Sequence, residues 1–163
     1  MSPLISTIVI GAGATALIDA WAIARRSLLG IPSPSYGLVG RWLAHMLRGR
    51  FRHDAITAAP PVRGERYIGW LAHYLIGIGF AAVLVGAGGV TWLRQPTIVP
   101  ALLVGVCTVA APFLLMQPGM GAGIAASRTP RPAAARLHSL VTHTLFGFGL
   151  YACARTLAFL STP

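Results

Sequence analysis

Residues 67–90 read YIGWLAHYLIGIGFAAVLVGAGGV, and this stretch decides the fold class because it contains no Asp, Glu, Lys or Arg. A helix needs about 20 mostly apolar residues to cross the hydrocarbon core of a bilayer. Three further stretches, residues 4–24, 98–116 and 138–160, are similarly apolar. We therefore predict an all-α protein, a four-transmembrane-helix bundle, built as a single integral-membrane domain of residues 1–163.

The composition of the chain agrees with a membrane protein. Its 163 residues are 55% hydrophobic and only 10% charged, whereas a soluble domain has roughly 25% charged residues. The thirteen basic residues are all arginine, and they lie between the apolar stretches instead of forming one soluble basic face. We therefore expect the lipid bilayer as the partner of this chain, and no nucleic acid.

The positions of the arginines predict the orientation of the chain in the membrane. Eight lie in the connection 25–66 and three in the connection 117–137, whereas Arg94 and Arg155 lie towards the other side. Connections rich in arginine stay in the cytoplasm. We therefore expect both of these connections to be cytoplasmic and both termini to lie outside.

The first cytoplasmic connection contains a helical pattern over residues 38–52. Arg41, His45, Arg48 and Arg52 fall on one face of this helix, and apolar residues cover most of the other. This pattern predicts a basic amphipathic helix that lies in the membrane interface. A helix packed across the cytoplasmic mouth of the bundle has the same pattern, and both interpretations stay open.

Small residues indicate close packing between the helices. Gly69, His73, Gly77 and Ala81 recur every four residues, and the small residues at this spacing let helix backbones approach one another. The glycine-rich faces also allow a homodimer. Pro112 lies inside the third apolar stretch and should kink that helix.

Three of the four apolar stretches carry an ionisable residue at a similar depth, namely Asp19, His73 and His143. At a rise of 1.5 Å per residue, each lies about 8–9 Å from the cytoplasmic end of its helix. Ionisable groups are costly in hydrocarbon and mark functional sites by default. We predict that these three residues converge on one polar pocket near the cytoplasmic face.

The chemistry of that pocket has several interpretations. The three residues can form a hydrogen-bond network that fixes helix register, or a site for a bound or translocated polar species. Two histidines and one carboxylate are also a ligand set for a transition metal, and histidines can relay protons. A metal held by Asp19, His73 and His143 is not favoured, because the sequence contains no H-x-x-H or H-E-x-x-H pair.

The loops supply candidates for the mouth of the pocket. Residues 117–123 form a glycine-dense turn whose backbone amides can bind an anion, although a flexible turn with membrane-orienting arginines would look the same. We expect Gln117, Glu65 and Arg128 at the mouth. Further contacts to an anion or an anionic lipid headgroup are expected from Arg41, Arg48, Arg52, His53, Arg63 and Arg136.

Four segments of the sequence together resemble a known family. They are GRWLAHM (40–46), GRFRH (49–53), APPVRGER (59–66) and QPGMGAGIAASRTP (117–130). They resemble the bacterial integral-membrane family called domain of unknown function 2938, and the resemblance runs nearly end to end. It implies a four-helix protein of the bacterial inner (plasma) membrane. In that membrane, the arginine count predicts that both termini lie on the periplasmic side. The resemblance supplies no activity and no catalytic residues.

The functional hypotheses therefore rest on the residues alone. The leading one is a small transport or binding protein with a polar pocket near the cytoplasmic face. The first alternative is a membrane-embedded enzyme that acts on a phosphorylated lipid or isoprenoid, and the second is a non-catalytic accessory or assembly protein. Whether the chain is an enzyme stays open, but a Walker ATP site and a G-x-S-x-G serine elbow are excluded by sequence.

Overall fold

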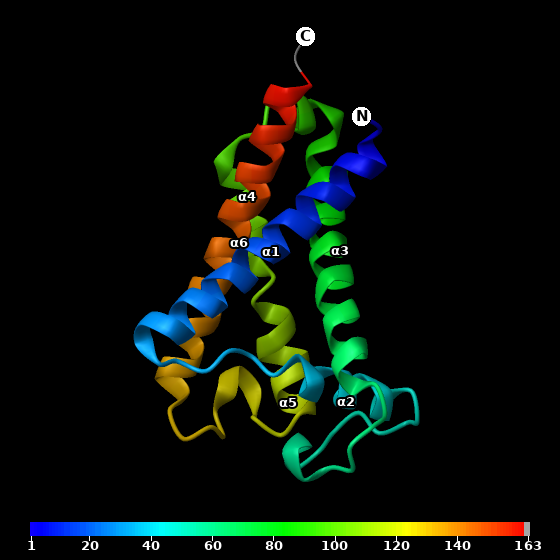
Figure 1. Ribbon diagram of the computed structural model, residues 1–163, viewed down its shortest axis with the longest axis vertical. Coiled ribbons are helices and arrows are strands. Elements are labelled where there is room, and N and C mark those ends of the chain that lie inside the picture. Colours follow the sequence, from blue (N-terminus) through cyan, green and yellow to red (C-terminus); the bar gives the residue numbers. More distant parts are fainter. Residues whose placement is uncertain (162–163) are drawn as a thin grey trace. The chain divides into compact units, whose positions relative to one another are not determined.

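The computed structural model describes residues 1–161 and is all-α, which confirms the predicted class (Figure 1). Its main helices are α1 (Pro3–Leu29), α2 (Tyr36–Met46), α3 (Glu65–Arg94), α4 (Ile98–Cys107) and α6 (Pro132–Leu160). Short helical segments complete the described chain. They are the 3-10 turns Ile56–Ala58 and Ile124–Ala126, the π-helical turn Pro112–Met116 and the single turn α5 (Gln117–Gly119).

Three helical segments within residues 1–161 are long and apolar enough to cross a membrane. They are Pro3–Leu29, Glu65–Arg94 and Ile98–Gly119, and they cover three of the four predicted spans. The fourth predicted span falls in α6, whose 29 residues give sufficient length. Because α6 also contains His138, His143 and Arg155, it is less apolar. The three candidate spans are those of a multi-pass membrane protein.

The ends of α1 show why this helix is longer than the apolar stretch. Ser2 caps its first turn by accepting a hydrogen bond from the Ile5 amide (3.4 Å), and Pro3 occupies the first helical position. Serine before the helix and proline in its first turn are favoured start residues. Gly30 ends the helix in the left-handed region, with φ 65°, where glycine carries no steric cost.

The chain divides into two compact units, which are described separately. Among the described residues, the first unit contains 1–33, 74–108 and 141–161, and the second contains 34–73 and 109–140. The prediction of one integral-membrane domain over residues 1–163 is not tested by this division.

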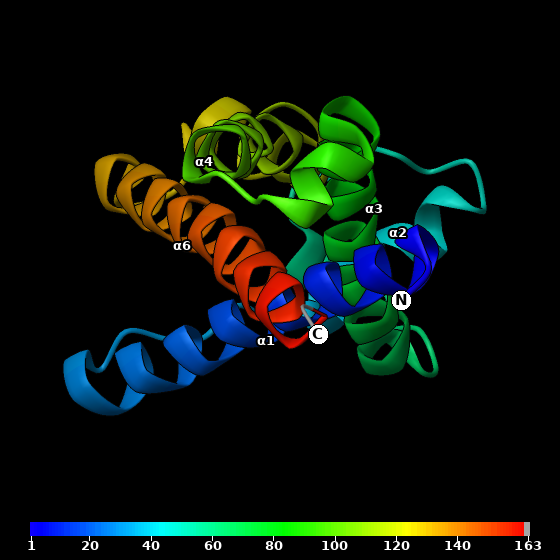
Figure 2. The ribbon, with the colours of Figure 1, turned by 90° about the horizontal axis from the view of Figure 1, so that it is seen from above.

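The first unit is held together by glycines at which helices touch. A Cβ atom on Gly105 of α4 would lie only 2.5 Å from the Gly147 Cα atom of α6, and Figure 2 shows these two helices side by side. Likewise, a Cβ on Gly11 of α1 would lie 2.5 Å from the Ile78 Cα atom of α3. The buried core around these contacts consists of Ile10, Ala14, Ala81, Leu84, Trp92, Ala101, Phe146, Leu150 and Ala154.

The second unit has its own small core. Trp42 of α2 is buried against Ile56 and Ala59, with Met116 and Met120 packed around them. The indole N–H of Trp42 donates to the Phe51 carbonyl at 2.8 Å, which satisfies its one polar atom. This core therefore joins α2, the segment after α2 and the turn around α5.

Helix α2 is shorter than predicted, and its buried side differs from the predicted apolar side. It ends at Met46 instead of continuing to Arg52, because Gly49 adopts a left-handed φ of 78° and the Arg48 and Arg50 amides both turn back to the His45 carbonyl. His45, placed on the polar face by its spacing, is buried, whereas Leu47 is exposed. Within its unit, α2 packs tightly on the first turns of α3, since a Cβ on Gly40 would collide with the Glu65 carbonyl.

The helix is irregular around Pro112, where a kink was predicted. Helix α4 ends at Cys107, and residues 112–116 form a π-helical turn. Because proline has no N–H, the Thr108 carbonyl cannot receive the usual helical bond from residue 112. The next amide, Phe113, bonds to the Val109 carbonyl at 3.1 Å. Local π-helical turns of this kind are frequent at functional positions.

We expect Gly105→Ala to destabilise the protein by about 1–3 kcal/mol, because the added methyl group meets backbone atoms that cannot move aside. Thermal unfolding in detergent measures this effect. Gly79→Ala is the matched control, since a Cβ on Gly79 has nothing within 4 Å. Equal melting temperatures for Gly105→Ala and Gly79→Ala would contradict the close contact between α4 and α6.

Candidate anion-binding site

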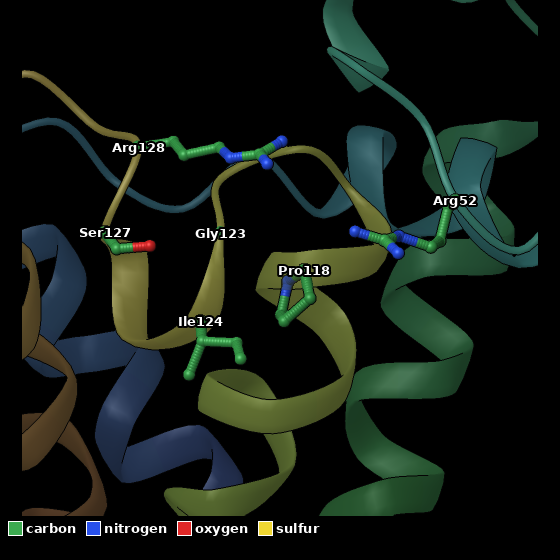
Figure 3. A pocket seen from close by; sticks show the side chains of 6 residues that line it. All are labelled: Arg52, Pro118, Gly123, Ile124, Ser127 and Arg128. Carbon is green, nitrogen blue, oxygen red and sulfur yellow. The ribbon is translucent and has the colours of Figure 1, made fainter.

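A cavity of about 200 Å³ lies in the second unit (Figure 3). Arg52, from the segment after α2, lines one side, and α5 with the turn after it supplies the rest. Pro118 lies in α5, and the residues of the turn are Gly123, Ile124, Ser127 and Arg128. The side chains of Arg52 and Arg128 lie on opposite sides of the cavity in Figure 3. Sites for drug-sized ligands usually exceed about 300 Å³, so this cavity suits a small group.

Two backbone hydrogen bonds bring the two sides of the cavity together. The His53 amide donates to the Gly119 carbonyl at 2.9 Å, and the Ile56 amide donates to the Met120 carbonyl at 3.0 Å. Gly121 adopts φ 93°, and a Cβ there would collide with the Asp54 backbone. Arg52 therefore precedes a segment that is fixed directly onto the turn carrying Arg128.

The turn itself contains strained backbone. Ala125 and Ala126 both have positive φ angles, 47° and 59°, and such conformations cost non-glycine residues of the order of 1–3 kcal/mol. Side chains hold them in place, because Arg136 Nε donates to the Ala125 carbonyl at 2.8 Å and the Thr129 hydroxyl donates to the Ala126 carbonyl at 2.8 Å. Strain maintained in this way clusters at ligand-binding sites.

The charges around the cavity define its chemistry. Two guanidinium groups and the Ser127 hydroxyl line it, and the lining contains no acidic side chain among the described residues. A guanidinium presents a planar fork of N–H donors that matches the oxygens of phosphate and carboxylate. Arg52 and Arg128 are exposed, so their side chains can adjust to a ligand. This arrangement can bind a small oxyanion.

Arg41 and Glu65 were both predicted near the ligand, but the structure pairs them with each other. Arg41 donates through Nε and Nη2 to the two carboxylate oxygens of Glu65, at 2.8 Å each. Its Nη1 donates to the Ala59 carbonyl at 3.0 Å, and the Val62 amide donates to Glu65 at 2.9 Å. The hydrogen bonds that Arg41 donates to the Glu65 carboxylate raise the pKa of Arg41. The Arg41–Glu65 pair thus forms a clamp that holds the segment 56–62. Contact of either residue with a ligand stays a prediction.

His53 has a partner that the sequence analysis missed. Its Nε2 atom lies 2.9 Å from Nδ1 of His45, and both side chains are buried, with exposed fractions of 6% and 7%. His45 Nε2 lies 3.1 Å from the Pro60 carbonyl, and His53 Nδ1 lies 3.4 Å from the Gly119 carbonyl. The eight-residue spacing conceals this pair, because the helix ends between the two residues.

Each of the intramembrane candidates has a local partner. In the first unit, the Tyr74 hydroxyl donates to the Asp19 carboxylate at 3.0 Å, and His143 Nδ1 lies 3.0 Å from the Thr108 hydroxyl. In the second unit, His73 stacks on Tyr36 with ring centroids 4.2 Å apart. Their convergence on one pocket is not tested.

Metal coordination by Asp19, His73 and His143 also stays a hypothesis. Within residues 1–161, no group of three His, Cys, Asp or Glu side chains is placed to hold a metal ion. The remaining candidates vary in exposure. Arg48, Arg63 and Arg136 are exposed, and Gln117 is half-buried, with its Oε1 atom lacking a hydrogen-bond partner in the described chain.

We expect Arg41→Gln to loosen the segment 56–62 without unfolding the helices, because the substitution removes the fork that holds Glu65. Amide hydrogen exchange should lose about tenfold or more protection at Ala59 and Val62. Arg48→Gln, at an exposed position of the same region, is the control and should leave exchange unchanged. Unaltered protection in Arg41→Gln would show that the clamp does not hold this segment.

Comparison with known proteins assigns the chain to a family. The family model described as a protein of unknown function (DUF2938) matches residues 8–157, which includes the cavity, the Arg41–Glu65 clamp and the histidine pair. No curated protein and no solved structure matches the chain significantly. Because the family match covers most of the 163 residues, the resemblance drawn from the sequence is confirmed, and the chain belongs to the DUF2938 family.

Proposed function

We propose that this protein is a multi-pass binding protein of the bacterial inner membrane that holds a small oxyanion on its cytoplasmic side. The ligand class is a phosphate or carboxylate group, either free or on a lipid headgroup. The observation that carries the proposal is the cavity in which Arg52 and Arg128, from separate segments, lie around Ser127. Transport of the bound species is one use of such a site.

The membrane arrangement is part of the proposal. We place α6 in the membrane as a fourth span beside the three candidates, because 29 residues suffice to cross a bilayer. The arginine-rich connections 25–66 and 117–137 then face the cytoplasm, and both termini face the periplasm. Arg52 and Arg128 belong to these two connections, so the anion site would lie at the cytoplasmic surface.

The surroundings of the cavity support a ligand that has an apolar part. Ile124 lines the cavity and is exposed, so an apolar group can rest against it while the arginines hold the oxyanion. A phosphorylated lipid headgroup presents both features at a membrane surface. Inorganic phosphate presents only the charged feature, and the two can therefore be distinguished by experiment.

We expect the purified protein to bind a short-chain phosphatidic acid, and Arg52→Gln/Arg128→Gln to weaken that binding by about tenfold or more. Calorimetry in detergent at low salt measures the affinity, which should fall as salt is added. Inorganic phosphate is the second probe, and comparable binding of phosphate would assign the site to a free anion.

The control for this experiment is Arg26→Gln/Arg131→Gln, which removes the same charge from exposed positions outside the cavity. The proposal predicts near-normal affinity for this variant. If both double variants lose affinity equally, the binding is a nonspecific effect of net charge and the proposal fails. It fails equally if the wild-type protein binds neither probe.

A further inference from the structure

The buried histidine pair is the strongest feature that the proposed function leaves unused. His45 lies in the last turn of α2, and His53 lies in the segment that docks on the turn after α5. The two rings and two backbone carbonyls form a continuous chain from Pro60 through His45 and His53 to Gly119. Its three contacts measure 3.1, 2.9 and 3.4 Å.

The carbonyls at the two ends fix where protons must sit. A backbone carbonyl can only accept a hydrogen bond. His45 Nε2, which faces Pro60, and His53 Nδ1, which faces Gly119, must therefore both carry hydrogen for the end contacts to form. Two neutral rings have one N–H each, and both N–H groups are then used at the ends.

The central contact determines the total number of protons. With both rings neutral and both end bonds formed, His45 Nδ1 and His53 Nε2 would face each other as two acceptors only 2.9 Å apart. One additional proton converts this contact into an N–H···N bond and completes the chain. A second additional proton would place two N–H groups head to head. The four ring nitrogens of His45 and His53 must therefore carry three protons in total for all three contacts to be hydrogen bonds.

A neutral pair can form the central bond only by giving up an end bond. If either ring changes tautomer, its nitrogen at the carbonyl becomes an acceptor that faces another acceptor. Buried polar atoms without partners cost about 1–3 kcal/mol. Completion of all three contacts therefore favours the singly protonated pair, whereas burial of the added charge opposes it.

We propose that His45 and His53 form a buried binding site for one additional proton, shared between the two rings, and that its uptake from water strengthens anion binding in the neighbouring cavity. The pair changes from neutral to a net charge of +1. The proton site stands on its own geometry, and only the coupling rests on the proposed function.

The coupling follows from shared residues. His53 directly follows Arg52, and Gly119 directly follows Pro118, so one histidine of the pair and the carbonyl that it contacts both adjoin residues that line the cavity. The additional proton adds positive charge beside the cavity, and it tightens the same junction that holds the two sides of the cavity together. Linkage makes the effect reciprocal, so a bound anion also favours the proton.

Some charged groups near the pair favour the additional proton, and others oppose it. Glu65 interacts electrostatically with His45 and favours the proton, although Arg41 neutralises much of its charge. The other charged residues on the segments around the pair are Arg48, Arg50, Arg52, Asp54, Arg63, Arg66 and Arg128. The arginines outnumber Asp54 and oppose the proton, and an anion bound between Arg52 and Arg128 would relieve that opposition.

The proton site is tested by NMR on the full chain with ¹⁵N-labelled histidine, from about pH 5 to about pH 8.5, the range in which histidines change charge. His45→Asn and His53→Asn serve to assign the signals. We expect the ring nitrogens of both residues to change together in one step, with a hydrogen-bonded N–H···N proton in the acidic form. Independent titration of the two rings, or neutral rings throughout, would overturn the proton site.

The coupling is tested with sulfate, whose charge stays constant over this pH range. We expect the wild-type protein to bind sulfate about tenfold more tightly at the acidic end. His53→Gln should bind sulfate with little pH dependence, and His138→Gln, which alters a histidine outside the pair, should behave as wild type. Equal wild-type affinity at both ends of the range would refute the coupling.

The two experiments separate the two proposals. A shared proton in the NMR spectrum, together with no binding of phosphatidic acid, phosphate or sulfate at any pH, refutes the anion-binding function and leaves the proton site intact. Sulfate binding that is independent of pH, with rings that titrate separately, refutes the proton site and leaves the anion-binding function intact. Because the NMR experiment uses the wild-type chain, it remains decisive even if a histidine variant fails to fold.

Discussion

The hydrogen bond from the His53 amide to the Gly119 carbonyl is the contact on which the second unit depends. It joins two segments that lie 66 residues apart in the sequence. The Ile56–Met120 bond extends it, and the tight approach of Gly121 to the Asp54 backbone admits no larger residue. Without this junction, Arg52 and Arg128 would belong to two unrelated loops. With this junction formed, Arg52 and Arg128 line one cavity. The histidine pair then lies between the Pro60 and Gly119 carbonyls.

Polar groups in this protein are organised by the cost of leaving them unpaired. Arg41 is joined to Glu65 and to two carbonyls, and buried polar groups need such partners. Arg52 and Arg128, in contrast, remain exposed around the cavity. This difference separates an arginine that maintains the fold from arginines available to a ligand. The histidine pair is an intermediate case, since its hydrogen bonds are complete only in one protonation state.

Much of the fold could be predicted from composition and spacing. Apolar length identified the long helices, Pro112 marked a real interruption, and the arginine-rich loops drew attention to Arg52 and Arg128. The meeting of those two residues could not be predicted, because it depends on backbone hydrogen bonds that leave no pattern in side-chain identity. The length of α2 was overestimated because a helical wheel ignores Gly49, whose positive φ ends the helix. His45 was placed on a polar face although it is buried beside His53.

The anion site is tested most directly by a crystal structure grown with selenate, an oxyanion whose selenium atom scatters anomalously. We expect an anomalous peak in the cavity, with guanidinium N–H groups of both Arg52 and Arg128 at hydrogen-bond distance from the selenate oxygens. The Ser127 hydroxyl should lie on the same anion. Ordered selenate elsewhere on the protein, with this cavity empty and the two arginines turned apart, would contradict it.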